Sequence, residues 1–332
     1  MPRNKRIEIP GAVYHVIARG IEGRDIFLHD FDREEFLRRL GKGLAETGCR
    51  CYAWALMPNH VHLLIATSVE PLSTLMRKVL TGYALFFNRK YGRTGYLFQS
   101  RYKSLLCQED IYFLELVRYI HLNPLIGGVV RSFDELENFW WTGHSVVIGK
   151  RKREWQCVDD VLSRFGEERS VAGERYRDFI KSGEKMGKRE DLVGGGFQKK
   201  SGVWKNAEHT AMDYKRGDQR ILGDPDFVGR VLKAIDEKIE RREKLLRENW
   251  NLDRLIGSVC EFMAVGKEDL KKKGRGNKLS KAKALIAFLG ARELGAKRTE
   301  IARYFEASKQ AVGKSLVLGE KVAKESGFKL LS

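Results

Sequence analysis

The sequence predicts an α+β domain followed by an all-α region. Over residues 1–149 a few strand-like runs alternate with longer helical patterns, which is typical of an antiparallel sheet covered by helices. Beyond about residue 250 only helical patterns remain. The length of 332 residues and the 42% hydrophobic content allow two or three domains with sizeable cores.

The first domain contains strands and helices in alternation. Gly92–Gly95 interrupts a long helical pattern, Asp110 is expected to cap the last helix, and Pro124 is expected to end it. The expected elements, in chain order, are a strand at Ala12–Arg19, a helix from about Asp32 to Thr47, a strand running from Cys51 to Ala66, a helix from about Pro71 to Tyr91, a strand near Tyr102–Cys107 and the helix from Asp110.

Two histidines flank one apolar residue within the strand-like segment Met57–Ile65. Side chains two apart on a strand point to the same face. His60 and His62 therefore present two imidazoles side by side, while Val61 faces the other way into a core. This arrangement suits a divalent cation, although the same pattern also arises in strands by chance.

The last helix of the first domain carries a tyrosine and an asparagine four residues apart. Tyr119 and Asn123 share a helix face, and Glu115 lies one turn earlier on it. A tyrosine hydroxyl near a carboxamide oxygen, aimed at the histidine strand, would supply a nucleophile and a third metal ligand. The alternative is structural, with Tyr119 packed over the sheet and Asn123 capping the helix end. We expect His15, in the first strand, to be structural as well.

Several of these segments together resemble the REP-associated tyrosine transposases of the HUH superfamily. The resemblance covers roughly residues 1–149, and its motifs arrive in the family's order. They are the histidine strand Met57–Ile65, the stretch Gly95–Ser104, the helix end Arg118–Pro124, the opening Gly11–Gly20 and the run Trp140–Ser145.

The resemblance implies a ferredoxin-like sheet and a specific chemistry. His60, His62 and Asn123 match the metal-binding positions, and Tyr119 matches the catalytic tyrosine. In this family the tyrosine attacks a phosphodiester of single-stranded DNA and leaves a 5′-phosphotyrosine and a free 3′-hydroxyl. A phenol with a pKa near 10 is a weak nucleophile, so the reaction calls for Mg²⁺ or Mn²⁺ to stabilise the developing charge.

The charge of the chain agrees with a nucleic-acid partner. The net charge is +18 and the pI is about 9.7, which is typical of nucleic-acid binders, although basic surfaces also bind acidic membranes. In the first domain, Arg101 and Lys103 are candidates for gripping the DNA backbone. The sequence has no run of eighteen apolar residues and no signal core, and its five cysteines form no CxxC pair. We therefore expect a cytoplasmic protein with no membrane contact.

The C-terminal region carries a second DNA-binding pattern. Residues 261–332 hold 17 Lys and Arg against eight Asp and Glu. Within Arg298–Leu316 the apolar spacing is that of a helix-turn-helix, with Ser308 capping the second helix. Residues 250–325 resemble the DNA-binding domain of the bacterial replication initiator, which implies duplex DNA binding. The side chains expected at the DNA are Lys271, Lys272, Lys273, Arg275, Lys309, Gln310 and Lys314.

The sequence thus predicts three regions and one enzyme. Residues 1–149 form the transposase domain, 150–249 a helical connecting region and 250–332 the helix-turn-helix domain. The predicted function is metal-dependent cleavage and rejoining of single-stranded or hairpin DNA, by a monomer or a homodimer. Two alternatives stay open: a non-catalytic DNA-binding regulator on the same scaffold, and, less favoured, a zinc-dependent hydrolase, for which the chain offers no HExxH motif.

Overall fold

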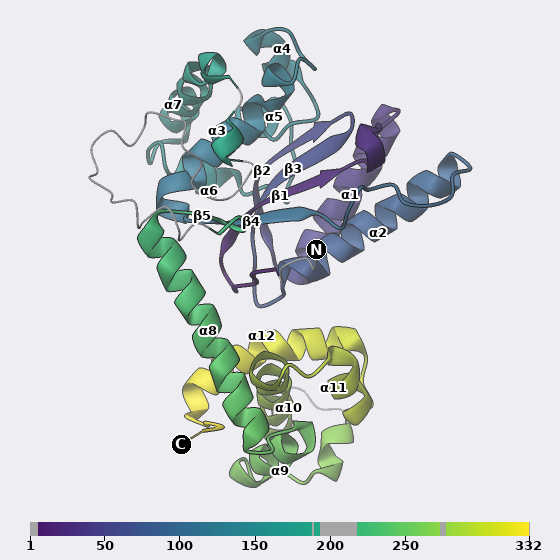
Figure 1. The fold of residues 1–332 in the computed structure, drawn as a ribbon, viewed down its shortest axis with the longest axis vertical. Coiled ribbons are helices and arrows are strands. Elements are labelled where there is room, and N and C mark those ends of the chain that lie inside the picture. Colours follow the sequence, from purple (N-terminus) through teal and green to yellow (C-terminus); the bar gives the residue numbers. More distant parts are fainter. Residues whose placement is uncertain (1–5, 188, 193–217, 273–276, 332) are drawn as a thin grey trace. The chain divides into compact units, whose positions relative to one another are not determined.

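The computed structural model describes residues 6–187, 189–192, 218–272 and 277–331 (Figure 1). It divides into two compact units, residues 1–229 and 230–332. The predicted connecting region, 150–249, is therefore shared between the units, and helix α8 (Pro225–Arg247) continues from one into the other. Within the described ranges no helix is long and apolar enough to cross a membrane.

The first unit is built on a five-stranded sheet of order β2-β3-β1-β4-β5. The first four strands are antiparallel to their neighbours, and β5 adds in parallel to β4. With two helices between the strands, this is the ferredoxin-like order that the resemblance implies, and the predicted α+β class is confirmed. The elements are β1 (Val13–Arg19), α1 (Asp30–Thr47), β2 (Arg50–Met57), β3 (His60–Ala66), α2 (Leu72–Lys90), β4 (Lys103–Cys107), α3 (Glu109–Ile126) and β5 (Ile221–Leu222).

The two faces of the sheet carry different helices. Trp54 of β2 packs against Trp155, which in turn lies on Gly41 of α1, and α1 packs along α2. The neighbouring residues Ala53 and Ala55 point the other way, into a core cluster with the apolar side of α3. Since successive strand residues alternate between faces, α3 covers the face opposite α1. That face is also the one to which His60 and His62 belong.

Three boundaries differ from the prediction. The segment from Cys51 to Ala66 is a hairpin, because Pro58 and Asn59 form a turn between β2 and β3. Helix α3 begins one residue earlier than expected, after Gln108, so Asp110 lies in its first turn. Pro124 lies inside α3, which continues to Ile126, and the Pro124 carbonyl accepts from the Val129 amide.

Residues beyond 149 pack onto α3 and complete the first unit. Short helices α4 (Phe133–Asn138), α5 (His144–Val147) and α6 (Val158–Leu162) precede α7 (Arg169–Ser182), which contacts α3 directly. The Tyr176 hydroxyl of α7 lies 2.7 Å from Nδ1 of His121 and 2.9 Å from Nδ1 of His144. These three fully buried side chains therefore join α3, α5 and α7 in one polar cluster.

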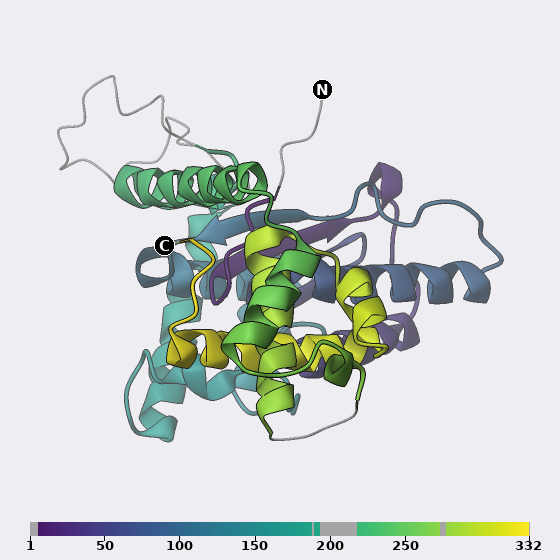
Figure 2. The ribbon, with the colours of Figure 1, turned by 90° about the horizontal axis from the view of Figure 1, so that it is seen from below.

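The second unit is entirely helical in the ranges described. Its main helices are α9 (Leu252–Phe262), α10 (Lys278–Leu289), α11 (Arg298–Tyr304) and α12 (Lys309–Ser326). Helix α12 packs closely on α10, since a Cβ on Gly319 would meet the Ala284 carbonyl (Figure 2). Ser308 caps α12 by accepting from the Ala311 amide, as predicted from the sequence.

The buried histidine cluster makes the first unit sensitive to mild acid. Burial lowers the pKa of His144 to about 4 and the pKa of His121 well below its usual range. Among the described residues, Nε2 of neither ring has a hydrogen-bond partner, so a proton added there would find no acceptor. The unfolded chain binds protons below about pH 6.5, and stability present at neutral pH is therefore lost as the pH falls from about 6.5 toward 4.

We predict that the free energy of unfolding falls between pH 7 and pH 5, by at most about 1.4 kcal/mol per pH unit for each buried histidine. The measurement is urea unfolding followed by tryptophan fluorescence, because five of the six tryptophans lie in the first unit. His144→Gln should flatten the slope, whereas His29→Gln, at an exposed position, should not. Equal slopes in all three proteins would contradict the assignment.

Candidate functional site

The strand ladder gathers the candidate residues of the sheet on one face. Across the β1–β3 pairing, His60 lies opposite Arg19 and His62 lies opposite Ile17. Across the β1–β4 pairing, Ile17 lies opposite Lys103. Opposed residues in a ladder point to the same face. The predicted pair of imidazoles is thus flanked by two cations, both exposed at the edge of the site.

Helix α3 brings Tyr119 and Asn123 onto the same face. The Tyr119 ring centroid lies 5.6 Å from that of His62 and 5.8 Å from that of His15, both edge to face. The Asn123 side chain is close enough to the Tyr119 hydroxyl to lower its pKa, and to the His60 ring to raise its pKa. The four residues that the sequence singled out therefore meet in one place.

Each of the two predicted histidine ligands is held by its Nδ1. His60 Nδ1 lies 2.6 Å from Asn59 Oδ1, and the amide of Asn59 donates to the Gly23 carbonyl at 3.0 Å. His62 Nδ1 lies 2.9 Å from Nε2 of His15. Nε2 of His62 is left over, whereas the His60 ring is also contacted by Asn123. Metal-binding histidines in proteins commonly use one ring nitrogen for the ion and the other for such a second contact.

Burial sets the protonation of the site. It lowers the pKa of His60 to about 4 and the pKa of His62 well below its usual range, and the nearby Arg19 adds to both effects. Both imidazoles are therefore neutral at pH 7, which is the form that binds metals. Burial also raises the pKa of Tyr119, and the Asn123 hydrogen bond and the charge of Arg19 act against this. The phenol is thus protonated at neutral pH.

The donor set fits a metal ion with an incomplete protein shell. Within the described ranges, no group of three or more His, Cys, Asp or Glu side chains is placed to hold a metal. The set at hand is two neutral imidazoles and one carboxamide oxygen, from His60, His62 and Asn123. Three donors leave positions for phosphate and water, as in catalytic sites, whereas a structural zinc site is closed by four.

Arg19 is the site residue that the sequence analysis missed. It is exposed, it faces the site across from His60, and its charge lowers the pKa of His60, His62 and Tyr119 alike. The signal was available, because strand alternation from His15 through Ile17 puts Arg19 on the histidine face. Its position at the strand end makes it free to approach a phosphate.

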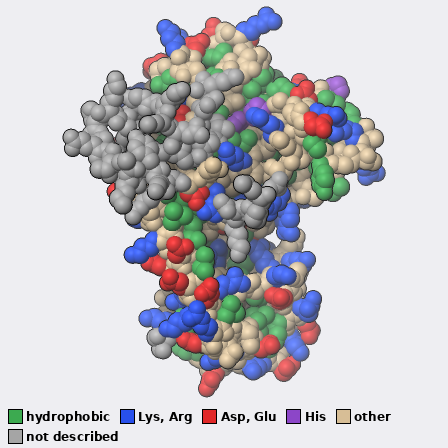
Figure 3. Space-filling model, viewed as in Figure 1, with side chains coloured by type: hydrophobic (Ala, Val, Ile, Leu, Met, Phe, Trp, Pro, Cys, Tyr) green, Lys and Arg blue, Asp and Glu red, His purple; other side chains and the backbone are tan. Residues whose placement is uncertain are grey.

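The predicted DNA-binding residues fall into two separate groups. Arg101 and Lys103 are exposed in the first unit, and Lys103 is on the face of the site. Lys309, Gln310 and Lys314 are exposed on α12. Lys271 and Lys272 form ion pairs, with Glu268 at 3.1 Å and with Asp269 at 2.6 Å. Lys273 and Arg275 lie outside the described residues. Figure 3 shows that Lys and Arg side chains are spread over both units.

Comparison with known families finds a similarity within the first unit. Residues 9–123 match the family described as "Transposase IS200 like", a range that includes both histidines, Tyr119 and Asn123. Over these residues the chain is similar to the IS200-like transposases. The structure of a REP-associated tyrosine transposase bound to a REP hairpin is also similar, with 18% identity and a TM-score of 0.38, over 48% of this chain and 90% of that one. No curated protein matches.

The family match confirms the resemblance of the transposase domain that the sequence motifs implied. It ends at residue 123, before the second unit begins. The resemblance of residues 250–325 to a replication initiator domain thus stays a prediction.

Proposed function

We propose that the transposase domain cleaves and rejoins single-stranded or hairpin DNA with Tyr119 as nucleophile. The observation that carries the proposal is the meeting of Tyr119, Asn123, His60 and His62 on one face of the sheet, with the Tyr119 ring edge-on to His62 and the Asn123 side chain beside both the hydroxyl and the His60 ring. The family match at residues 9–123 supports DNA as the substrate. If Asn123 had only a structural role, it would not need the two neutral imidazoles of His60 and His62 beside it.

In the proposed step the Tyr119 oxygen attacks the scissile phosphorus. A bond forms between this oxygen and phosphorus, and the bond from phosphorus to the 3′ oxygen breaks. The phenolic proton leaves Tyr119 and a proton is taken up by the 3′ oxygen, so the step is balanced. The covalent product keeps the energy of the phosphodiester, so a 3′-hydroxyl can reverse the step without ATP.

The surrounding residues have separate tasks in this proposal. Asn123 orients the Tyr119 hydroxyl, and Arg19 lowers the pKa of that hydroxyl and can pair with a phosphate oxygen. His60, His62 and Asn123 would hold Mg²⁺ or Mn²⁺. The ion, when bound, would supply charge stabilisation at the phosphate. Lys103, on the same face, is placed to contact the strand beyond the scissile group.

We further propose that the second unit binds duplex DNA through α12. Ser308 fixes the start of this helix, and three polar side chains in its first two turns are exposed: Lys309, Gln310 and Lys314. The excess of basic residues in this part of the chain supports the proposal. The unit would then hold the enzyme on duplex DNA while the first unit acts on a single strand.

Tyr119→Phe should abolish covalent attachment to DNA, by more than 100-fold, while binding of the same oligonucleotide stays within about threefold. The measurement is a denaturing gel of protein incubated with labelled single-stranded hairpins and Mg²⁺ or Mn²⁺. Tyr112→Phe, two turns earlier on α3, is the matched control and should keep the adduct. An adduct in Tyr119→Phe refutes the nucleophile; no adduct in any protein despite tight binding favours the non-catalytic regulator.

His60→Ala should weaken Mn²⁺ binding at least tenfold and abolish the metal-dependent adduct, because one of three protein donors is lost. Manganese binding is measured by electron paramagnetic resonance on the full-length protein, which reads the ion directly. His29→Ala, at an exposed histidine outside the site, serves as control. Adduct formation that persists in a chelator would rule out the metal.

Replacing Lys309 and Lys314 together by Gln should reduce the salt dependence of duplex binding. Each lost phosphate contact lowers the slope of log K against log salt by about one. Lys321 and Lys324, on the same helix but paired with glutamates, form the control double variant. If both double variants change the slope equally, the first two turns of α12 do not form the duplex contact.

A further inference from the structure

His15 lies between the site and a segment that is distant in sequence. Its Nε2 is 2.9 Å from Nδ1 of His62, and its Nδ1 is 3.0 Å from the carbonyl oxygen of Leu192. His15 and Leu192 are fully buried, and His62 is 3% exposed. No water molecule can therefore replace these contacts without a rearrangement of the core.

The chemistry of these contacts fixes where the protons are. A carbonyl oxygen only accepts, so Nδ1 of His15 must carry the proton that it donates to Leu192. The fully buried His15 ring contacts the Leu192 carbonyl, the His62 ring and the Tyr119 ring, and none of these carries a negative charge that would stabilise a buried imidazolium. The ring is therefore neutral and its Nε2 has a lone pair. His62 must then donate from Nδ1, and the neutral His62 ring keeps a bare Nε2. The chain of contacts thus selects one tautomer of His62.

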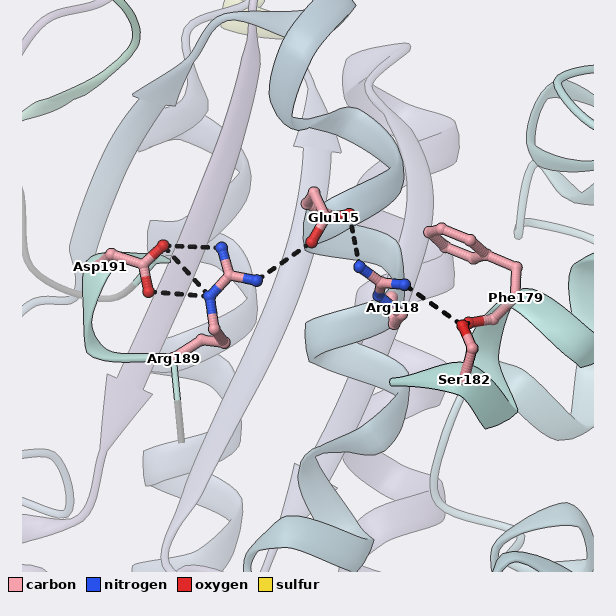
Figure 4. Close-up of polar contacts among 6 residues, drawn as sticks. All are labelled: Glu115, Arg118, Phe179, Ser182, Arg189 and Asp191. Atoms are coloured by element: carbon pink, nitrogen blue, oxygen red, sulfur yellow. Dashed lines mark hydrogen bonds and ion pairs between the residues drawn. The ribbon is translucent and has the colours of Figure 1, made fainter. Parts of the chain in front are cut away.

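The Leu192 carbonyl is placed by an ion-pair network on α3. Arg189 binds Asp191 through two nitrogens, at 2.9 and 2.7 Å, and reaches Glu115 at 3.2 Å (Figure 4). Glu115 also accepts from Arg118 at 2.5 Å. Figure 4 shows the two arginines on either side of Glu115. Glu115 lies one turn before Tyr119 in α3. The short 3-10 turn Glu190–Leu192 is in this way attached to the helix that carries the nucleophile.

A second contact fixes the path of the chain into this turn. After α7 the backbone passes α3 so closely at Gly183 that a Cβ there would lie 2.6 Å from Cδ of Arg118 and 2.8 Å from Cδ1 of Leu122. Ser182 accepts from Arg118 at 3.5 Å, and the Arg118 guanidinium stacks 4.3 Å above the Phe179 ring. The segment that delivers Leu192 is thus held at both ends.

We propose that residues 189–192, acting through His15, position His62 as a metal ligand by holding it in the tautomer with a bare Nε2. His15 and Leu192 are positioning residues and touch neither metal nor DNA. Residues 189–192 lie outside residues 9–123, the range of the family match, so a segment further along the chain completes the site. The metal-binding part of the proposal rests on the proposed function, whereas the tautomer does not.

The first test reads the tautomer in metal-free, full-length protein labelled with ¹⁵N-histidine. Long-range proton–nitrogen spectra distinguish a protonated from a bare ring nitrogen, and the seven histidines are assigned by single substitutions. We expect His62 to be protonated at Nδ1 and bare at Nε2. His15→Gln should keep this state, because the Gln oxygen can accept from His62 while its NH₂ donates to Leu192. His15→Leu, which removes both contacts, should shift His62 toward the Nε2-protonated form.

The second test measures Mn²⁺ affinity by electron paramagnetic resonance in the same proteins. Loss of a residue that orients a metal-binding histidine typically weakens binding 10- to 100-fold, so we expect this range for His15→Leu and a change within threefold for His15→Gln. Arg189→Met acts from the surface without a cavity in the core and should weaken binding severalfold. Arg175→Met on α7, hydrogen-bonded to the Phe165 carbonyl, is its control and should change nothing.

These outcomes separate the two proposals. If wild-type protein binds no Mn²⁺ but His62 has the expected tautomer, which His15→Leu alters, the metal site fails and the positioning role of His15 holds. If His62 is protonated at Nε2 in the wild type, or if His15→Leu, confirmed as folded by circular dichroism, changes neither tautomer nor affinity, the positioning role is refuted. Should His15→Leu not fold, Arg189→Met and His15→Gln decide by the same readouts.

Discussion

The site depends on the packing of α3 across β2 and β3. This contact is made by apolar residues, Leu116, Val117 and Ile120 on the helix against Ala53 and Ala55 on the sheet. Small side chains on β2 let the helix approach closely. Tyr119 and Asn123 therefore stand over the end of β3, at the histidines. Without this contact the Tyr119 hydroxyl and the two imidazoles would belong to separate surfaces.

The same packing sets the chemistry through burial. Taking His60 and His62 out of water keeps them neutral and able to bind a cation, and it keeps the Tyr119 phenol protonated. A buried phenol is a poor nucleophile on its own. The charge of Arg19 and the side chain of Asn123 lower the pKa of the Tyr119 hydroxyl, and the proposed metal ion would have the same effect.

Periodicity predicted much of the sheet and which residues share a face, and the resemblance to the tyrosine transposases then singled out Tyr119, His60, His62 and Asn123 as the candidate site. A spacing of two put His60 and His62 on one face of a strand, and a spacing of four put Tyr119 and Asn123 on one face of a helix. The hairpin was missed because apolar residues continue on both sides of Pro58 and Asn59 and hide the turn. Pro124 was misjudged as the end of the helix, because α3 continues past it for two more residues, to Ile126.

Contacts between segments far apart in the chain could not be predicted from the sequence. His15 meets a carbonyl 177 positions away, and the Arg189–Glu115 ion pair joins residues 74 positions apart. No periodic pattern links such residues, since their meeting depends on how α7 and the following turn pack on α3. Sequence reasoning accordingly gave His15 a structural role and found no part for residues 189–192.

The most direct test of Tyr119 as the nucleophile is to locate the bond between protein and DNA. Residues 119–131 form one tryptic peptide, and Tyr119 is its sole tyrosine. Wild-type protein is incubated with a hairpin oligonucleotide and Mn²⁺, digested with trypsin and nuclease, and analysed by tandem mass spectrometry. With Tyr119 as the nucleophile, we expect a nucleotide on the tyrosine of this peptide. A nucleotide on Tyr112 or another residue, or adduct-free cleavage that yields a hydrolysed 5′-phosphate, would contradict it.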